Sequence, residues 1–145
     1  KRYALKCVEK NIVLKHEMEK FLRCEKEILQ SIDSPFIVKL YETFKDTHYV
    51  YLLLNYIEGG DFFDFLSELG ICNTSTTQFY FGCLFLGIEY LHNNSIIYRD
   101  LKPENAAINS NGYLHIIDLG TAKLLTDDPE TGFRTFTIIG KNYVI

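Results

Sequence analysis

Residues 98–120, with the sequence YRDLKPENAAINSNGYLHIIDLG, contain the pattern of polar residues that decides the fold. Asp100, Lys102 and Asn105 fall within six positions, and Asp118 follows Asn105 by thirteen. Single carboxylates are common on protein surfaces, but this set could hold a divalent metal, a phosphate and an attacking hydroxyl at once. The stretch therefore indicates phosphoryl transfer.

The composition of the chain excludes several classes of protein. Its 145 residues are 47% hydrophobic and 14% aromatic, enough for one domain with a core or a large part of one. A net charge of −4 argues against nucleic-acid binding as its main role. No apolar run approaches the ~18 residues of a membrane span, and no signal-peptide pattern occurs. The cysteines are widely spaced, which indicates reduced thiols in a cytoplasmic protein: Cys7, Cys24, Cys72 and Cys83.

Hydrophobic periodicity predicts an α+β protein with a small strand-and-helix unit, followed by a linker and a helical unit that carries a short hairpin. The predicted strands lie at 2–9, 36–44, 48–56, 106–109 and 113–117, the helices at 14–32, 62–69 and 76–93, and a loop from Thr121 onward. Ligands favour clefts between such units, so we expect the site near the linker at Gly59-Gly60. The helix at 76–93 is apolar almost all round, and nothing in the remaining sequence is large enough to cover it.

Lys6 and Glu25 form a predicted pair on the first unit. Lys6 shares a strand face with Ala4 and Val8, and Glu25 lies on the apolar stripe of the following helix. A lysine on an apolar face is costly unless a negative group meets it. The pair either aims the ammonium at nucleotide phosphates or is a structural ion pair, and the two residues alone do not separate these alternatives.

The polar loop offers a role for each of its residues. Asp100 could accept or orient the proton of an attacking hydroxyl, and Lys102 could offset charge on the transferring group. Asn105 and Asp118 offer oxygen ligands suited to Mg²⁺. The alternatives are a polar loop ended by Pro103 and a strand-end turn at Asp118, but the combined spacing favours the site.

Further charged residues suggest contacts with a substrate and with a phosphorylated loop. Asp61 and Glu104 could pair with basic residues of a peptide, or could be solvated surface charges. Arg99, beside Asp100, could clamp a phosphothreonine at Thr137, which otherwise is an ordinary loop residue.

Over nearly its whole length the chain resembles a eukaryotic protein kinase. The stretch 3–6 (YALK) is similar to the VAIK strand, Glu25 to the glutamate of helix C, 98–100 (YRD) to HRD, Asn105 to the second metal ligand, and 118–120 (DLG) to DFG. YRDLKPEN and RTFTIIG are similar to the AGC group, and within it to the cGMP-dependent kinases. The resemblance implies part of a two-lobed kinase fold, with an N-lobe portion and hinge at 1–57 and a C-lobe portion at 58–145.

The resemblance also implies a serine/threonine kinase that uses ATP and Mg²⁺ and prefers basic protein substrates. It assigns Leu54 as gatekeeper, Asn55 to Ile57 as the hinge, Ala4 and Ala107 to the adenine faces, Asp61 to the ribose, and Asp61 with Glu104 to substrate arginines. Leu29, Leu40, Tyr98 and Leu119 would stack as a hydrophobic spine. A cyclic-nucleotide-binding domain is expected in the parent chain.

The sequence also departs from the family pattern. The glycine-rich phosphate loop would precede Lys6, and GKNYVI at 140–145 stands where the family has GTPxYxAPE. We therefore expect the isolated 145 residues to lack activity, and we expect them to be poorly soluble because the helix at 76–93 is left uncovered. The competing interpretation is a pseudokinase or truncated product that binds nucleotide or a partner without turnover. A purely structural domain would leave the metal and base residues unexplained.

Overall fold

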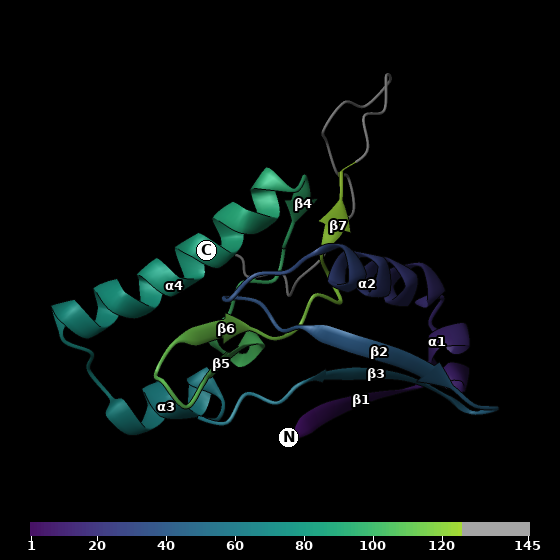
Figure 1. Ribbon diagram of the computed structural model, residues 1–145, viewed down its shortest axis with the longest axis horizontal. Coiled ribbons are helices and arrows are strands. Elements are labelled where there is room, and N and C mark those ends of the chain that lie inside the picture. Colours follow the sequence, from purple (N-terminus) through teal and green to yellow (C-terminus); the bar gives the residue numbers. More distant parts are fainter. Residues whose placement is uncertain (126–145) are drawn as a thin grey trace.

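The computed structural model describes residues 1–125, and Figure 1 shows their arrangement. A three-stranded sheet with two helices forms one part, and two helices with a short hairpin form the other. The elements are β1 (Tyr3–Glu9), α1 (Lys10–Lys15), α2 (Glu19–Ser31), β2 (Leu40–Lys45), β3 (Tyr49–Asn55), α3 (Phe62–Leu69), α4 (Thr74–Asn93), β4 (Ile96–Ile97), the 3₁₀ helix η1 (Pro103–Asn105), β5 (Ala106–Ile108), β6 (Leu114–Ile116) and β7 (Lys123–Leu124). The mixed α+β class predicted from periodicity is confirmed.

The sheet has the antiparallel order β1-β3-β2 and presents one face to α2. Side chains along β1 alternate between exposed and partly buried, with Ala4, Lys6 and Val8 on the buried side. Leu52 of β3 is fully buried beneath α2, together with Ile28 and Leu29 of that helix. The alternation seen in the sequence thus places Lys6 on the core side of the sheet.

The prediction of one helix at 14–32 is wrong in one respect, because two helices, α1 and α2, occupy this part of the chain. Glu17 has a φ of 53°. At the end of α1, the His16 N–H donates to the Ile12 carbonyl and the Glu17 N–H donates to the Leu14 carbonyl. The apolar stripe from Leu14 therefore does not continue into α2, and Leu14 is 60% exposed. A left-handed residue ends an α-helix whatever the periodicity of the neighbouring side chains.

The strand predicted at 36–44 begins only at Leu40. The preceding residues pair with the hairpin instead: Val38 donates to the Ile116 carbonyl over 2.8 Å, and Ile116 donates to the Phe36 carbonyl over 2.9 Å. The loop expected from Thr121 onward also contains a short strand, because β7 pairs with β4. Both corrections involve pairing between segments far apart in the sequence.

The β5–β6 hairpin turns at Asn111-Gly112 as predicted, and Gly112 has a φ of 84°. The Asn109 Oδ1 atom accepts the backbone N–H groups of Asn111 and Tyr113, each over 2.9 Å. Its amide nitrogen therefore donates to His115 Nε2, 2.9 Å away. Neutral His115 consequently carries its proton on Nδ1.

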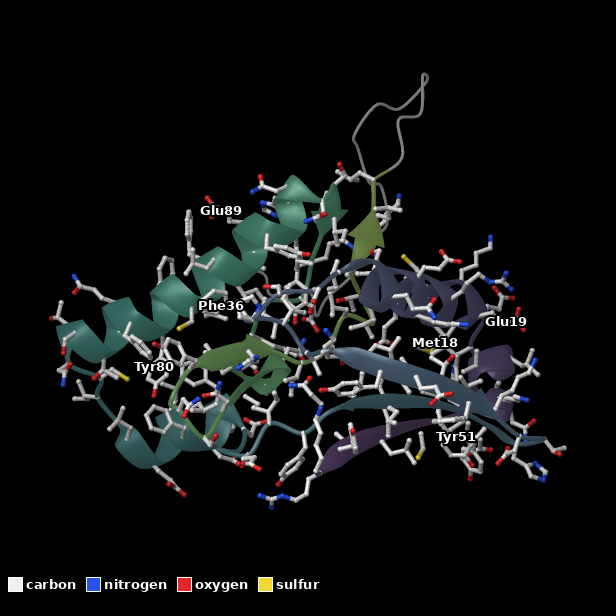
Figure 2. All side chains as sticks on the ribbon, in the orientation of Figure 1. Met18, Glu19, Phe36, Tyr51, Tyr80 and Glu89 are labelled. Atoms are coloured by element: carbon white, nitrogen blue, oxygen red, sulfur yellow. The ribbon has the colours of Figure 1, made fainter. Side chains whose placement is uncertain are left out.

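Helix α4 crosses the hairpin at close range. A Cβ atom at Gly87 would lie 3.1 Å from Ile116 Cδ1 and 3.5 Å from Phe36 Cβ, so glycine permits this approach. In Figure 2, Phe36 lies between α4 and the hairpin, and Tyr80 points from α4 toward α3, where its ring centroid is 5.1 Å from that of Phe62. On the other side of α4, apolar side chains are exposed: Phe81 by 68% and Phe85 by 58%. This agrees with the expectation that the helix is left partly uncovered.

Candidate active site

The two parts of the structure meet at Lys6. Its ammonium lies 2.6 Å from Glu25 Oε1 on α2 and 3.0 Å from Asp118 Oδ1, which follows β6. The Glu25 side chain is only 5% exposed, whereas those of Lys6 and Asp118 are 33% and 47% exposed. The predicted Lys6–Glu25 pair is thus present, and a second carboxylate, 112 residues away in sequence, joins it.

The electrostatics of this cluster keep Lys6 charged. Burial alone would lower the pKa of Lys6, but the two carboxylates together raise it above its usual value. Burial raises the pKa of Glu25, and Lys6 offsets only part of that rise. Burial also acts to raise the pKa of Asp118, but Lys6 and the Gly120 N–H together lower it. Lys6 is therefore charged, and its side chain is one-third exposed, so the ammonium can take part in charge-assisted hydrogen bonds to phosphate.

The loop before η1 holds a second cluster, around Asp100. Lys102 Nζ lies 2.7 Å from Asp100 Oδ2, and Asn105 Nδ2 donates to the same oxygen over 2.9 Å and to the Asp100 carbonyl over 3.0 Å. Asn105 is buried, so its amide fixes the direction of the aspartate. The structure thus brings together the three polar residues of the loop that the sequence singled out.

Asn105 and Asp118 fit the ligand chemistry of Mg²⁺. Because both bonds to Asp100 use the Asn105 amide nitrogen, its Oδ1 oxygen remains as the ligand atom. The Ile117 N–H donates to the Asn105 carbonyl over 3.0 Å, which places the start of the 118–120 segment beside η1. No group of three or more His, Cys, Asp or Glu side chains within residues 1–125 is arranged to hold a metal alone. An amide and a carboxylate suit an ion that takes its other ligands from phosphate and water.

Arg99 takes a strained backbone conformation next to Asp100. Its φ is 73°, and its side chain donates to the Thr121 carbonyl over 2.7 Å and to the Ala122 carbonyl over 3.5 Å. Burial lowers the pKa of its guanidinium. Thr137, the expected phosphorylation site, lies outside the described residues, so the clamp between the two stays a prediction.

The residues assigned to adenine lie on three elements around the linker. Ala4 of β1 pairs with Leu54 of β3, which is 6% exposed, and Asn55 ends that strand. Ile57 follows in the linker, and Ala107 of β5 forms a bridge with Asp61. The structure brings Ala4 and Leu54 together, and Ala107 and Asp61 together, while their roles toward a nucleotide stay predictions.

Asp61 and Glu104 have different local environments. Asp61 is the N-cap of α3, where its Oδ1 accepts the N–H groups of Phe63 over 2.7 Å and of Asp64 over 3.4 Å. Glu104 is an exposed residue of η1, which packs against α3. Asp61 thus has a structural role that the sequence analysis did not assign, although an aspartate just before an apolar helix is the signal for it.

Two glycines matter for the site and were not predicted as functional. A Cβ at Gly59 would lie 2.5 Å from the Ile108 carbonyl oxygen, and one at Gly120 would lie 3.2 Å from Asp118 Oδ1 and 3.6 Å from Glu25 Oε2. Gly59 allows the linker to contact the hairpin, and Gly120 allows the carboxylates to approach each other. The Gly-Gly pair was a visible signal for the first, while the second depends on packing.

A hydrophobic core joins both parts behind the site. Leu29, Tyr98 and Leu119 are buried in one cluster, and Leu40 packs against it. The Tyr98 hydroxyl is buried, and this burial raises its pKa. The four residues expected to stack as a spine therefore lie in one core. Within the same residues, no helix combines the length and apolar character needed to cross a bilayer.

Comparison with known proteins gives the family. The model of the protein kinase domain matches residues 1–144. Among curated proteins, the cGMP-dependent protein kinase of Plasmodium berghei is 42% identical over 96% of this chain and 16% of its own length. Human cGMP-dependent protein kinase 2 is 41% identical over 95% of the chain and 18% of its own length, and the cAMP-dependent protein kinase catalytic subunit of Dictyostelium discoideum is 43% identical over 95% and 20%. The chain spans a fifth or less of these relatives, and it belongs to the protein kinase family as a catalytic-domain segment of AGC type.

Proposed function

We propose that the protein containing this segment is a serine/threonine kinase that transfers the γ-phosphoryl group of Mg-ATP to protein hydroxyls. The observation that carries the proposal is Lys6, whose ammonium contacts both Glu25 and Asp118. A purely structural ion pair needs one carboxylate, whereas a phosphate-binding lysine must lie between the helix that orients it and the ligands of the metal. The relatives named as cGMP-dependent kinases support the same activity.

Each polar residue of the site has a proposed role. Lys6 would bind nucleotide phosphates and Glu25 would hold it in place. Asn105 and Asp118 would hold Mg²⁺, which would offset the negative charge of the phosphate groups. Asp100 would orient the attacking hydroxyl, and its bonds to Asn105 and Lys102 fix the direction of its carboxylate.

A preference for basic protein substrates is the finer part of the proposal. Lys and Arg are absent from the sequence between Lys45 and Arg99, so α3 carries Asp64 and Glu68 after its N-cap Asp61 and has no basic residue of its own. Asp61 caps α3, and Glu104 lies on η1, which packs against α3. An arginine on a peptide would find complementary charge there.

The parent chain is further proposed to be cytoplasmic and to carry a cyclic-nucleotide-binding domain. All four cysteines are free thiols, which suits a reducing compartment. The regulatory domain rests on the names of the relatives alone.

The test is phosphorylation of an arginine-containing peptide by the parent chain, compared with Asp100→Ala and Lys6→Met variants. We expect the wild type to transfer phosphate and both variants to lose at least a hundredfold in kcat/KM. Binding of Mg-ATP without turnover in the wild type would instead establish a pseudokinase. Peptides with lysine or arginine replaced by alanine would test the substrate preference separately.

A further inference from the structure

The linker between the two parts of the structure is firmly attached at its C-terminal end. The Gly59 N–H donates to the Ile108 carbonyl over 2.7 Å, and the Ile108 N–H donates to the Gly60 carbonyl over 3.0 Å. The linker thus adds to the β5–β6 hairpin like a short strand. A Cβ at Gly59 would collide with Ile108 backbone atoms, so residues 59–60 move with the hairpin.

The linker is equally well attached at its N-terminal end. Asn55 N donates to the Lys39 carbonyl over 2.9 Å, and Lys39 N donates to Asn55 Oδ1 over 2.6 Å. Asn55 is also paired with Tyr3 of β1. The end of β3 therefore moves with the sheet, and residues 56–58 are left as the segment that can absorb a rotation between the two parts.

One side chain from the sheet contacts this segment. Arg2 Nη2 lies 2.8 Å from Glu58 Oε1, and the Arg2 guanidinium lies 5.2 Å from the centroid of the Tyr56 ring. Figure 1 shows that the start of β1 lies beside the segment that joins β3 to α3. Arg2 thus bridges from the edge strand to both ends of the stretch 56–58.

We propose that Arg2, Tyr56 and Glu58 form a clasp that limits rotation of the two parts about residues 56–58 and slows release of a nucleotide. The proposal rests on the proposed function, because the nucleotide would lie between Ala4, two residues from Arg2, and Ala107 of the hairpin. Opening the two parts would stretch the Arg2–Glu58 ion pair, because Arg2 adjoins β1 of the sheet and Glu58 directly precedes Gly59, which is bonded to the hairpin. Arg2 is therefore a positioning residue with no contact to the reacting atoms.

The clasp has a modest strength and a definite salt dependence. The Arg2 and Glu58 side chains are 71% and 44% exposed, so the pair belongs to the class of weak surface ion pairs. Its loss should change opening and nucleotide release by about two- to fivefold. The effect should fade at about 1 M salt, where the screening length falls to about 3 Å.

The test uses the parent chain with Glu58→Gln and a matched control, Asp33→Asn. Asp33 also forms an exposed ion pair, 2.9 Å from Lys39 Nζ, but both partners lie on the sheet side of the linker. Each variant removes one exposed carboxylate charge from an ion pair. A charge exchange, Arg2→Glu with Glu58→Arg, tests rescue of the pair.

Two measurements separate the clasp from the proposed function. Hydrogen–deuterium exchange without nucleotide should be about two- to fivefold faster at residues 56–58 in Glu58→Gln, and unchanged there in Asp33→Asn. Stopped-flow release of a fluorescent ATP analogue should accelerate by the same factor in Glu58→Gln, with kcat little changed and the effect reversed by the charge exchange.

Equal exchange at 56–58 in wild type and Glu58→Gln overturns the clasp. Faster exchange with an unchanged release rate overturns its effect on the nucleotide. Faster exchange in a parent chain that binds no ATP supports the clasp as a restraint on the linker and refutes the proposed function instead.

Discussion

Substitution of Gly59 by alanine should disconnect the linker from the hairpin. The new Cβ would lie 2.5 Å from the Ile108 carbonyl oxygen, 3.0 Å from the carbonyl carbon and 3.1 Å from the Asn109 carbonyl oxygen. These are backbone atoms, and they are held by the pairing of Ile108 with Leu114 and by the bond from Asn109 N to the Tyr113 carbonyl. The linker must therefore move away from the hairpin.

The magnitude follows from the hydrogen bonds that such a movement breaks. Separation of the linker loses the Gly59–Ile108 bond and the Ile108–Gly60 bond. At about 0.5–1.5 kcal/mol for each, the junction should lose about 1–3 kcal/mol. Gly82→Ala is the matched control, because its Cβ meets nothing within 4 Å and the helix interior should gain up to about 1 kcal/mol.

The assay is hydrogen–deuterium exchange of the parent chain, resolved at residues 59 and 108. In Gly59→Ala both amides should exchange about ten- to a hundredfold faster, while amides of the β1–β3 pairing keep their protection. Gly82→Ala should leave both amides protected. If Gly59→Ala exchanges at the wild-type rate at these two positions, the linker is not anchored by this contact and the reasoning is refuted.

Three further changes test the site and its surroundings. Lys6→Met should destabilise α2 by about 3 kcal/mol, because Glu25 is left buried without its lysine. Glu25→Gln in the same chain should recover part of this loss; exchange protection of α2 measures both, and no recovery would contradict the pairing. Burial lowers the pKa of His115, so the unfolded chain binds a proton below about pH 6.5 that the folded chain does not, and hairpin stability should fall as pH drops below that value. His115→Gln should flatten this dependence in pH-resolved exchange, and parallel profiles would argue against it. Asp61→Ala should lower the stability of α3 by about 1 kcal/mol, because it removes the acceptor of the Phe63 N–H. Asp61→Asn should lower the stability less, and thermal melting of the parent chain measures both variants.

The sequence predicted the elements whose signals are local. The helix at Phe62–Leu69 was predicted with the bounds that the structure has, and Asn111-Gly112 marked the hairpin turn. Lys6 and Glu25 could be paired because alternation in a strand and a stripe on a helix each predict a buried face. Spacing also identified the cluster around Asp100, since its members lie within six residues.

The features that were missed depend on contacts distant in sequence or on unusual backbone angles. Glu17 has a positive φ where α1 ends, and a glutamate in the sequence does not predict this conformation. The residues before Leu40 are as apolar as a strand, but they pair with Ile116, far along the chain. The contact of Lys6 with Asp118 likewise could be expected only from the family resemblance.

The ion pair between Lys6 and Asp118 has a consequence for how the chain can be divided. Its partners are 112 residues apart, so the ammonium meets the second carboxylate only when β1 and the segment that follows β6 have been brought together. A protease cut between the two positions would place them on different pieces of the chain. An intact ion pair therefore reports that both parts of the segment have come together.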